Sequence, residues 1–289
     1  MIRAAILTPA PDYHEAHDWA YDSQAAALEG AGIEVVSRVW NEPSVEDGVD
    51  FVVPLVAWGY HQHQTQWHVL LDRLEANGVA VLNPVPLLRW NSDKAYLAEL
   101  ADAGISAVPT IMVAALHDKD LAHAREQFAT PELVIKPPVS AGADGTFRLA
   151  IGDPLPDAVR GRRMLIQPFQ RSIVTSGELS VMIFDGVASH AVMKRAKPGD
   201  FRVQPHLGGR EELAEAPPSA IALAHAALAR APARAAYARV DMIMTDDGTW
   251  QIMELELIEP ALWLDLAPGS ARRFGKAIRT AVEEILAQR

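Results

Sequence analysis

Cysteine is absent from this chain of 289 residues. Without a thiol, the protein has no disulfide, no cysteine nucleophile and no zinc site built on thiolates. Basic residues are also few, since 26 lysines and arginines stand against 37 aspartates and glutamates, which gives a formal net charge of −11. This balance argues against nucleic acid or an anionic membrane as the main partner, because both are negatively charged.

Long hydrophobic stretches are missing as well. No apolar run approaches the roughly 20 residues that cross a bilayer, and residues 1–9 turn polar too quickly for a signal peptide. We therefore expect a cytoplasmic location. A hydrophobic content of 49% and a charged content of 22% are ordinary for a globular protein, and the length allows two or three lobes with their own cores.

Several well-known catalytic and nucleotide-binding motifs do not occur either. The small-residue segment 140–146 matches neither G-x-x-x-x-G-K-[ST] nor G-x-G-x-x-G. The serines have no G-x-S-x-G context, so a hydrolase triad is unsupported. His61, His63 and His68 suggest a metal, but their spacing fits no standard site.

Apolar runs alternate with amphipathic segments over roughly the first 85 residues. We expect strands at 4–8, 34–39, 51–57 and 79–82, and helices at 23–31 and 64–76. Strand and helix alternation of this kind predicts a small parallel α/β domain. Asn91 or Ser92 can cap a helix that runs to Ala103 and ends at Gly104.

The pattern changes to short strands and turns from residue 107 onward. We expect strands at 108–113, 133–136, 147–150, 164–168, 179–184 and 187–194, and helices at 219–231 and 272–286. The last helix carries Phe274, Ile278, Val282 and Ile285 on one stripe. Residues 199–218 are expected to form a mobile loop.

Carboxylates are concentrated on two neighbouring segments near the C-terminus. Segments 237–244 and 250–257 are rich in apolar residues and flank an Asp-Asp-Gly turn, which predicts a β-hairpin. Because side chains alternate along a strand, Glu254 and Glu256 share a face, and Asp241 can face them from the partner strand. Three converging carboxylates repel one another and lose hydration unless a cation lies among them. Such oxygen ligands suit Mg²⁺, especially Mg²⁺ shared with phosphates.

Glu259 follows the same segment at an odd spacing from Glu254. Alternation along a strand predicts that its side chain faces the other way. We therefore expect it to lie behind the metal ligands or on the substrate side.

A lysine and a glycine-rich loop precede this hairpin in the chain. Segment 140–146 (Ser-Ala-Gly-Ala-Asp-Gly-Thr) follows the predicted strand that ends in Lys136. Backbone N–H groups of such a loop can approach phosphate oxygens, and the lysine supplies a positive charge. A plain hairpin connection explains the loop equally well. By itself Lys94 is interpreted as a solvated lysine in the first turn of its helix, and Lys194 either contacts an anionic ligand or pairs with a nearby carboxylate.

The order of these features is more specific than any one of them. The motifs come in this order: a lysine at a helix start, a strand lysine before a glycine-rich loop, a strand end, and then G-E, K, F-R, R-V-D and E-x-E. In this order of motifs, the chain resembles the ATP-grasp superfamily over nearly its whole length. Segment 194–209 (KRAKPGDFRVQPHLGG) is similar to the glutathione-synthetase-like and ribosomal-protein glutamate ligase branch. Segment 254–260 (ELELIEP) is similar to the ending of cycloserine-forming ATP-grasp ligases.

The resemblance implies a fold and a domain division. An N-terminal parallel α/β pre-ATP-grasp domain, residues 1–88, would precede a two-lobed ATP-grasp domain. Its small lobe would span residues 89–170 and its C-terminal lobe residues 171–289.

The resemblance also implies a role for each matching residue. The ATP phosphates would be bound by Lys94, Lys136, Ser140, Gly142, Gly145 and Thr146. The adenine would lie against Gln167, Pro168 and Phe169, and the ribose against Glu178. Catalytic groups at the nucleotide and the transferred phosphate would be Lys194 and Arg202. Two Mg²⁺ ions, with Mn²⁺ as an alternative, would be held by Asp241, Glu254 and Glu256.

Glu256 is a departure from the family, which usually has asparagine at this position. A glutamate adds a negative charge and can bind bidentately, so metal binding can be kept or tightened. A second departure is Gln204, where the ligase branch often has asparagine. Neither change removes a required chemical group.

The function implied is that of an ATP-dependent carboxylate–amine ligase acting on small molecules. A carboxylate would attack the γ-phosphate to give ADP and an acyl phosphate, and an amine would then displace phosphate. Positioning and charge neutralisation accomplish this without a nucleophilic side chain, which suits a chain without cysteine. Two alternatives stay open: intramolecular cyclisation of an amino-acid derivative, and an ATP-binding module without catalysis.

The substrates would lie between the N-terminal strand ends and the C-terminal lobe. Candidate contacts on the loops after Thr8 and Ala57 are His14, Asp18, Trp58, Tyr60 and His61. The resemblance also makes a homodimer possible, but no interface is recognisable in the sequence.

Overall fold

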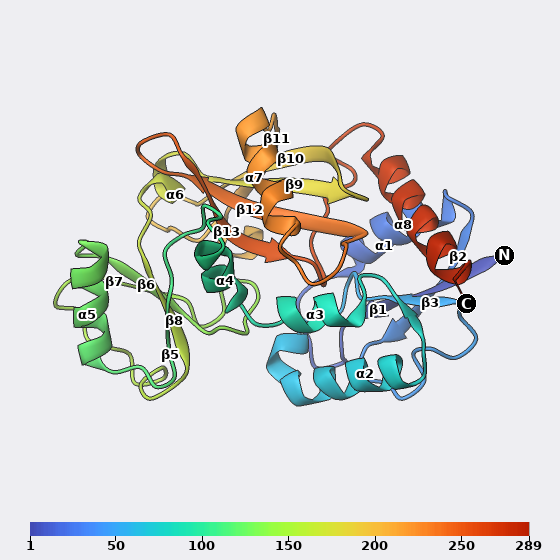
Figure 1. Ribbon diagram of the computed structural model, residues 1–289, viewed down its shortest axis with the longest axis horizontal. Coiled ribbons are helices and arrows are strands. Elements are labelled where there is room, and N and C mark those ends of the chain that lie inside the picture. Colours follow the sequence, from blue (N-terminus) through green and yellow to red (C-terminus); the bar gives the residue numbers. More distant parts are fainter. Residues whose placement is uncertain (289) are drawn as a thin grey trace.

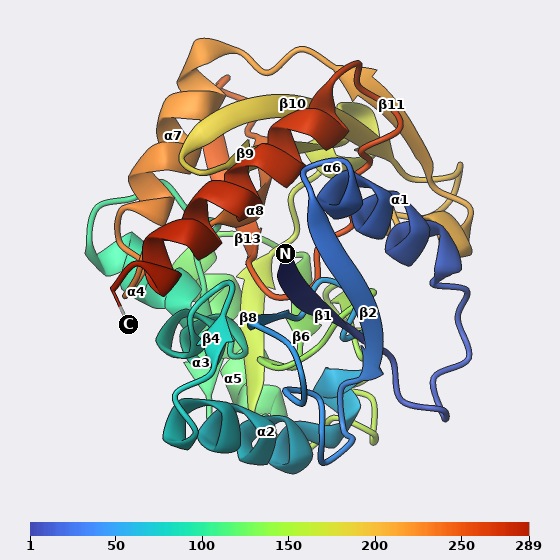
Figure 2. The ribbon, with the colours of Figure 1, turned by 90° about the vertical axis from the view of Figure 1, so that its right-hand side faces the viewer.

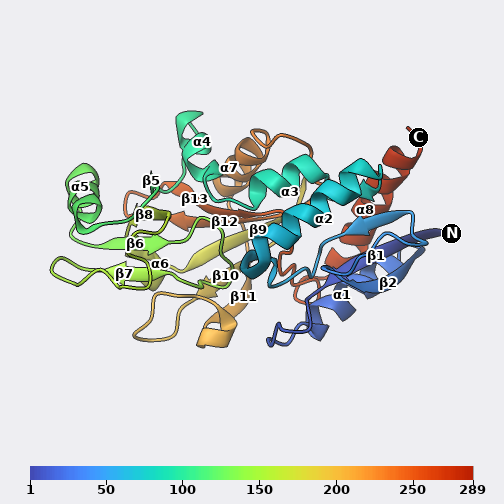
Figure 3. The same ribbon diagram turned by 90° about the horizontal axis from the view of Figure 1, so that it is seen from below.

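The computed structural model describes residues 1–288, which form three sheets in succession (Figure 1). The sheet orders are β2-β1-β3-β4, β5-β8-β6-β7 and β11-β10-β9-β12-β13. The molecule is elongated, with the first sheet at one end, the second at the other and the third between them (Figures 1 and 3). None of the described helices is long and apolar enough to cross a membrane.

The first sheet is parallel, as the alternating pattern predicts. Its elements in chain order are β1 (Ile2–Thr8), α1 (Asp18–Glu29), β2 (Ile33–Val39), β3 (Phe51–Val53), the 3-10 helix η1 (Tyr60–His63), α2 (Gln64–Ala76) and β4 (Ala80–Val81). The strand expected at 51–57 is shorter than predicted, because Pro54 follows β3 directly and has no N–H for the sheet.

Two short helices replace the single helix expected after Asn91. They are α3 (Val85–Asn91) and α4 (Tyr96–Asp102), and Lys94 lies in the turn between them rather than in a first helical turn. Neither Asn91 nor Ser92 is an N-cap, because α4 has Ala95 in that position, so this prediction is wrong. The domain bounds remain a prediction, and the proposed division after residue 88 falls inside α3.

The second and third sheets contain antiparallel strands, in agreement with the expected mixed α/β class. The elements around the second sheet are β5 (Ile111–Val113), α5 (Asp118–Phe128), β6 (Leu133–Lys136), β7 (Phe147–Leu149), β8 (Met164–Pro168) and α6 (Ser172–Thr175). Those of the third are β9 (Glu178–Phe184), β10 (Val187–Arg195), the 3-10 helix η2 (Pro205–Leu207), β11 (Arg210–Ala214), α7 (Pro218–Leu228), β12 (Tyr237–Met244), β13 (Trp250–Glu256) and α8 (Ser270–Leu286). Segment 199–218, expected to be a loop, therefore contains η2 and β11.

The C-terminal helix α8 packs against elements near the N-terminus of the chain. Phe274, Ile278 and Val282 are buried, and Ile285 is partly buried, as the stripe predicts. They pack in one core with residues of β1, α1 and β9. Figure 2 shows α8 lying beside α1.

Candidate active site

A cavity of about 1230 Å³ lies where the three sheets meet. Every residue that the sequence assigns to phosphate, adenine, ribose or metal lines its wall. Among the weaker substrate candidates, Trp58, Tyr60 and His61 line the cavity, whereas His14 and Asp18 do not. The structure thus brings the predicted residues together, although their individual roles remain predictions.

The β12–β13 hairpin sets the carboxylates in register. Asp241 pairs across the strands with Glu254, as the alternation predicts, and Arg239 pairs with Glu256. From the other side, Tyr96 receives the N–H of Leu255 at 2.8 Å and donates to its carbonyl at 3.1 Å. Asn91 likewise bonds the carbonyl of Leu255 and the N–H of Leu257, at 2.8 and 2.9 Å. These tertiary bonds explain why Asn91 is not a cap.

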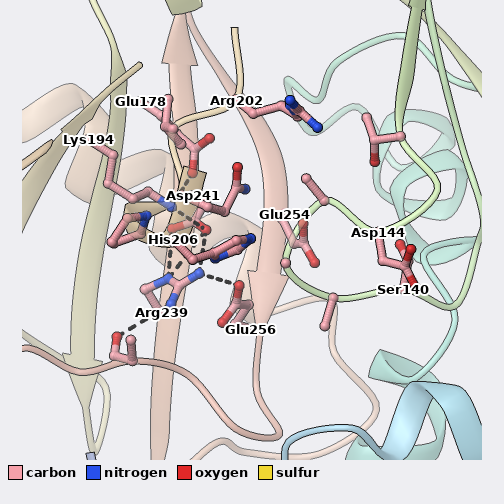
Figure 4. Close-up of a pocket in the computed structure, with 18 of the residues that line it drawn as sticks. Ser140, Asp144, Glu178, Lys194, Arg202, His206, Arg239, Asp241, Glu254 and Glu256 are labelled. Carbon is pink, nitrogen blue, oxygen red and sulfur yellow. Dashed lines mark hydrogen bonds and ion pairs between the residues drawn. The ribbon is translucent and has the colours of Figure 1, made fainter. Parts of the chain in front are cut away.

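A cation of the protein itself lies among the carboxylates. The Arg239 guanidinium donates to both oxygens of Asp241, with Nε 3.0 Å from Oδ1 and Nη2 2.9 Å from Oδ2, and it also contacts Glu256 (Figure 4). Lys194 lies 3.0 Å from Asp241, and Ser180 donates to Asp241 at 2.6 Å. These carboxylates therefore have a cation beside them without a metal, which the sequence-based expectation did not include. The signal was present, because the spacing in Arg-Val-Asp puts residues 239 and 241 on one face.

The pKa values of these groups reflect burial and the cations together. Burial raises the pKa of Asp241, but Arg239 and Lys194 outweigh it and hold that pKa well below its usual range. For Glu256, burial followed by the fields of Asp241 and Glu254 raises the pKa to about 7 despite the nearby guanidinium. Asp241 is therefore the stable anion of the group.

Lys94 links the glycine-rich loop to β13. Its ammonium is buried, contacts the carbonyl of Ser140, and lies 3.1 Å from Oε1 of Glu254. Its backbone N–H also donates to the carbonyl of Pro138 at 2.8 Å. The interpretation of Lys94 as a solvated lysine is therefore wrong.

Lys136 is a buried cation with a different environment. It is 8% exposed, and no ion pair within residues 1–288 includes it. Burial, with Lys94 nearby, lowers the pKa of its ammonium. A cation that is desolvated and unpaired in a cavity wall suits an anionic ligand.

The loop after Lys136 needs its glycines. Gly142 and Gly145 have φ of 60° and 66°, in the left-handed region where other residues are strained. A Cβ on Gly145 would lie only 2.8 Å from Cγ of Pro137. Glycine at position 145 therefore allows the loop backbone to pass close to Pro137, where a side chain would collide.

The expected adenine contacts lie at the end of β8. Gln167 and Pro168 belong to the strand, and the N–H of Phe169 already donates to the carbonyl of Glu132 at 2.9 Å. This N–H is therefore already bonded within the protein. The Phe169 ring packs under Arg148, 3.9 Å from its centroid.

Two other predicted residues have partners within the protein. Glu178 forms a buried ion pair with Lys194, and burial raises the pKa of Glu178. Arg202 is held by Asp200 on its own loop, at 2.9 Å, and stays partly exposed to the cavity (Figure 4). If Arg202 turns toward a ligand, Asp200 keeps the hydrogen bonds that its Oδ1 accepts from the backbone N–H groups of Phe201 and Arg202.

Glu259 lies in the same cavity wall as Glu254 and Glu256, so the expectation that it faces away is wrong. The cause is local: β13 ends at Glu256, and the chain then leaves the alternation of a strand. Its carbonyl accepts a hydrogen bond of 3.0 Å from the Trp58 indole.

Carboxylate oxygens are the donors that Mg²⁺ prefers, so this set fits that ion chemically. Within residues 1–288, however, no three acidic or histidine side chains already stand in metal-binding geometry. The oxygens of Asp241 are engaged by Arg239, Lys194 and Ser180. A metal would therefore take these oxygens from the protein's own cations.

Comparisons with known proteins identify relatives of this chain. The family model for the N-terminal domain of D-cycloserine synthetase DcsG matches residues 4–83. The chain is 30% identical over 272 residues to the cycloserine biosynthesis protein DcsG of Streptomyces lavendulae, covering 87% of this chain and 90% of that protein. The crystal structure of D-cycloserine synthetase DcsG superposes with a TM-score of 0.83 at 27% identity, covering 97% of this chain and 99% of that one.

A more distant likeness extends the comparison of the fold. The crystal structure of D-alanine–D-alanine ligase from Bacillus anthracis complexed with ATP has a TM-score of 0.74 at 18% identity, with 100% of this chain and 99% of that chain covered. Fold, site and relatives together define an ATP-dependent ligase that forms C–N bonds. Within this class, the chain belongs to the ATP-grasp superfamily, as the order of its motifs predicts.

Proposed function

We propose that this ligase activates a small-molecule carboxylate as an acyl phosphate and joins it to an amine, with release of ADP and phosphate. The observation that carries the proposal is Lys136, a buried ammonium without an ion pair, beside a loop whose backbone is open to a ligand. Phosphate groups would supply the negative charge that Lys136 lacks.

The other residues of the wall would then have distinct tasks. Lys94 and the loop at Ser140, Gly142, Gly145 and Thr146 would hold the phosphates. The base and ribose would lie against Gln167, Pro168, Phe169 and Glu178. Lys194 and Arg202 would neutralise charge that develops on the transferred phosphate, which is the main requirement of phosphoryl transfer.

Asp241, Glu254 and Glu256 are proposed to hold Mg²⁺, as two ions, with Mn²⁺ as an alternative. The ions would neutralise phosphate charge and hold the phosphates in place. Arg239 would keep Asp241 ionised and in position, because it donates to both of its oxygens. A cytoplasmic location and a homodimer remain predictions.

Intramolecular amide formation is a second candidate. The observation that favours it is the likeness to a cycloserine biosynthesis protein over 90% of that protein's length. In this case one molecule would carry both the carboxylate and the attacking N–H group. ADP release would then need no second amine, and the product would weigh one water less than the substrate.

Glu254→Ala tests the proposal through ADP release. With pooled amino acids as carboxylate and amine sources, the wild type should release ADP, and the variant should lose at least about 100-fold in rate, because the Mg²⁺ that Glu254 would hold neutralises transition-state charge. Glu29→Ala, an exposed glutamate of α1, is the matched control and should keep full turnover. Full turnover by Glu254→Ala would refute the metal assignment. Binding of ATP without ADP release from any pool would favour the non-catalytic module.

A further inference from the structure

Glu259 is a carboxyl group of the cavity wall that lacks a cationic partner. Among residues 1–288 the neighbouring acids Glu254 and Glu256 pair with Lys94 and Arg239, but no ion pair includes Glu259. Burial and the field of Glu256 raise the pKa of Glu259 well above its ordinary value. The surroundings of this group thus favour a positively charged ligand beside it.

Gln24 presents a second acceptor next to this group. It extends from α1, is 2% exposed, and donates through Nε2 to the carbonyl of Pro260 at 3.3 Å. Its Oε1 is buried and has no hydrogen-bond partner, although Gln24 lines the cavity. A buried acceptor without a donor is unfavourable, so this oxygen points to a ligand that supplies an N–H or O–H group.

Aromatic rings that line the cavity contact the backbone of Glu259 through Trp58. The Trp58 indole, which donates to the carbonyl of Glu259, packs against Trp19 at 5.7 Å and Tyr13 at 6.3 Å between ring centroids. All three rings line the cavity, and Trp19 remains 48% exposed. Aromatic faces attract organic cations and suit them better than bare metal ions, which need several oxygen ligands.

We propose that Gln24, Glu259 and the rings of Trp58, Trp19 and Tyr13 form a subsite for the ammonium group of an amino-acid substrate. The subsite offers two oxygen acceptors and aromatic faces, which together fit an N–H-rich cation attached to carbon. The same molecule would direct its carboxylate toward Lys136 and the phosphates, so the inference rests on the proposed function. The held ammonium is protonated and does not attack the acyl phosphate. The reacting amine is therefore a different group, on the same substrate or on a second one.

The test is a direct binding measurement, with tryptophan fluorescence or calorimetry in the presence of ADP and Mg²⁺. The probes are D- and L-alanine and D- and L-serine, each with its N-acetyl derivative. We expect at least one free amino acid to bind, and its N-acetyl form to bind about tenfold or more weakly, because a charge-assisted hydrogen bond is lost. Glu259→Gln should weaken binding of that amino acid by a similar factor, about tenfold. Gln24→Leu should weaken it by about threefold to tenfold.

Glu29→Gln is the matched control, and ADP binding should be unchanged in all three variants, which shows that the nucleotide site is intact. Equal binding of free and acetylated amino acids, wild-type affinity in Glu259→Gln, or no binding of any free amino acid would each overturn the subsite. ADP release separates this inference from the proposed function. Amino-acid binding without ADP release would defeat the function and keep the subsite. ADP release by Glu259→Gln with an unchanged KM for the amino acid would support the proposed function and refute the subsite.

Discussion

Replacing Arg239 by methionine removes the buried cation that bridges Asp241 and Glu256. The Arg239 side chain is 8% exposed and that of Asp241 is 4% exposed, so water cannot replace the lost partner. Leaving a buried charge unpaired costs about 3–5 kcal/mol. Because Lys194 still pairs with Asp241 and the Glu256 side chain is 29% exposed, we expect Arg239→Met to lose about 3 kcal/mol of unfolding free energy, the lower end of this range. At about 2–4 °C per kcal/mol, this corresponds to a fall in Tm of roughly 6–12 °C.

A double-mutant cycle isolates the interaction from other effects of the substitution. Urea unfolding of the wild type, Arg239→Met, Glu256→Gln and the double variant should give a coupling energy of about 1–3 kcal/mol, because neutralising Glu256 removes one of the charges that Arg239 offsets. Arg195→Met is the control, since Arg195 forms an exposed pair with Glu212 at 3.1 Å and should cost no more than about 1 kcal/mol.

A free energy of unfolding for Arg239→Met within about 1 kcal/mol of the wild type, or additivity of the two substitutions within about 0.5 kcal/mol, would show that Arg239 does not stabilise this cluster. Mg²⁺ gives a second readout on the same proteins. Because the variant keeps the carboxylates but lacks their internal cation, added Mg²⁺ should stabilise it more than it stabilises the wild type. Equal stabilisation would count against a metal at Asp241 and Glu256.

Three further predictions concern the phosphate side of the cavity and its rim. Lys136→Met should bind ATP about tenfold or more weakly, which calorimetry measures. It should also be at least as stable as the wild type in thermal unfolding, because a desolvated ammonium without an ion pair is removed. Gly145→Ala should raise the KM for ATP, because the new Cβ would collide with Pro137 and displace the loop. Gly152→Ala, also at positive φ but with open space around it, should change only stability, by about 1 kcal/mol. Equal KM values for the two variants would contradict a role of the loop's path in ATP binding. Burial, with Lys94 nearby, lowers the pKa of His61 below 6.5 in the folded protein. The unfolded chain therefore binds this proton first as the pH falls, and stability is lost from about pH 6.5 downward. In urea unfolding, His61→Gln should lose less stability than the wild type between about pH 7.5 and about pH 5.5.

Local patterns accounted for the parts of the fold that depend on nearby residues. The β12–β13 hairpin and its facing pair Asp241 and Glu254 follow from alternation and one turn, and the structure has that register. The apolar stripe of α8 was equally readable, because helical spacing alone determines which side chains share a face. Helix α5 was missed because only Leu121 and Ala124 of its residues are buried, which leaves almost no apolar pattern.

Errors arose where tertiary contacts decide the role of a residue. Asn91 has the side chain of a helix cap, but it bonds the backbone of β13, more than 160 residues away in sequence. Lys94 appeared solvated because nothing in the adjacent sequence shows that Ser140 and Glu254 enclose it. Glu259 could not be placed by alternation, because the sequence does not mark that β13 ends at Glu256.

The pairing of charges in the cavity implies that nucleotide and metal binding depend on each other. Lys94 is paired with Glu254, and Lys194 and Arg239 are paired with Asp241. A phosphate that draws Lys94 away leaves Glu254 without a cation, and a metal at Asp241 leaves Lys194 with Glu178 alone and Arg239 with Glu256 alone. When both ligands arrive, the freed lysines face phosphate and the freed carboxylates face metal, so neither charge stays buried alone. By linkage, Mg²⁺ must then tighten nucleotide binding by the same factor by which the nucleotide tightens Mg²⁺ binding. Arg239→Met, which removes one of the cations that a metal displaces, should make this mutual factor smaller.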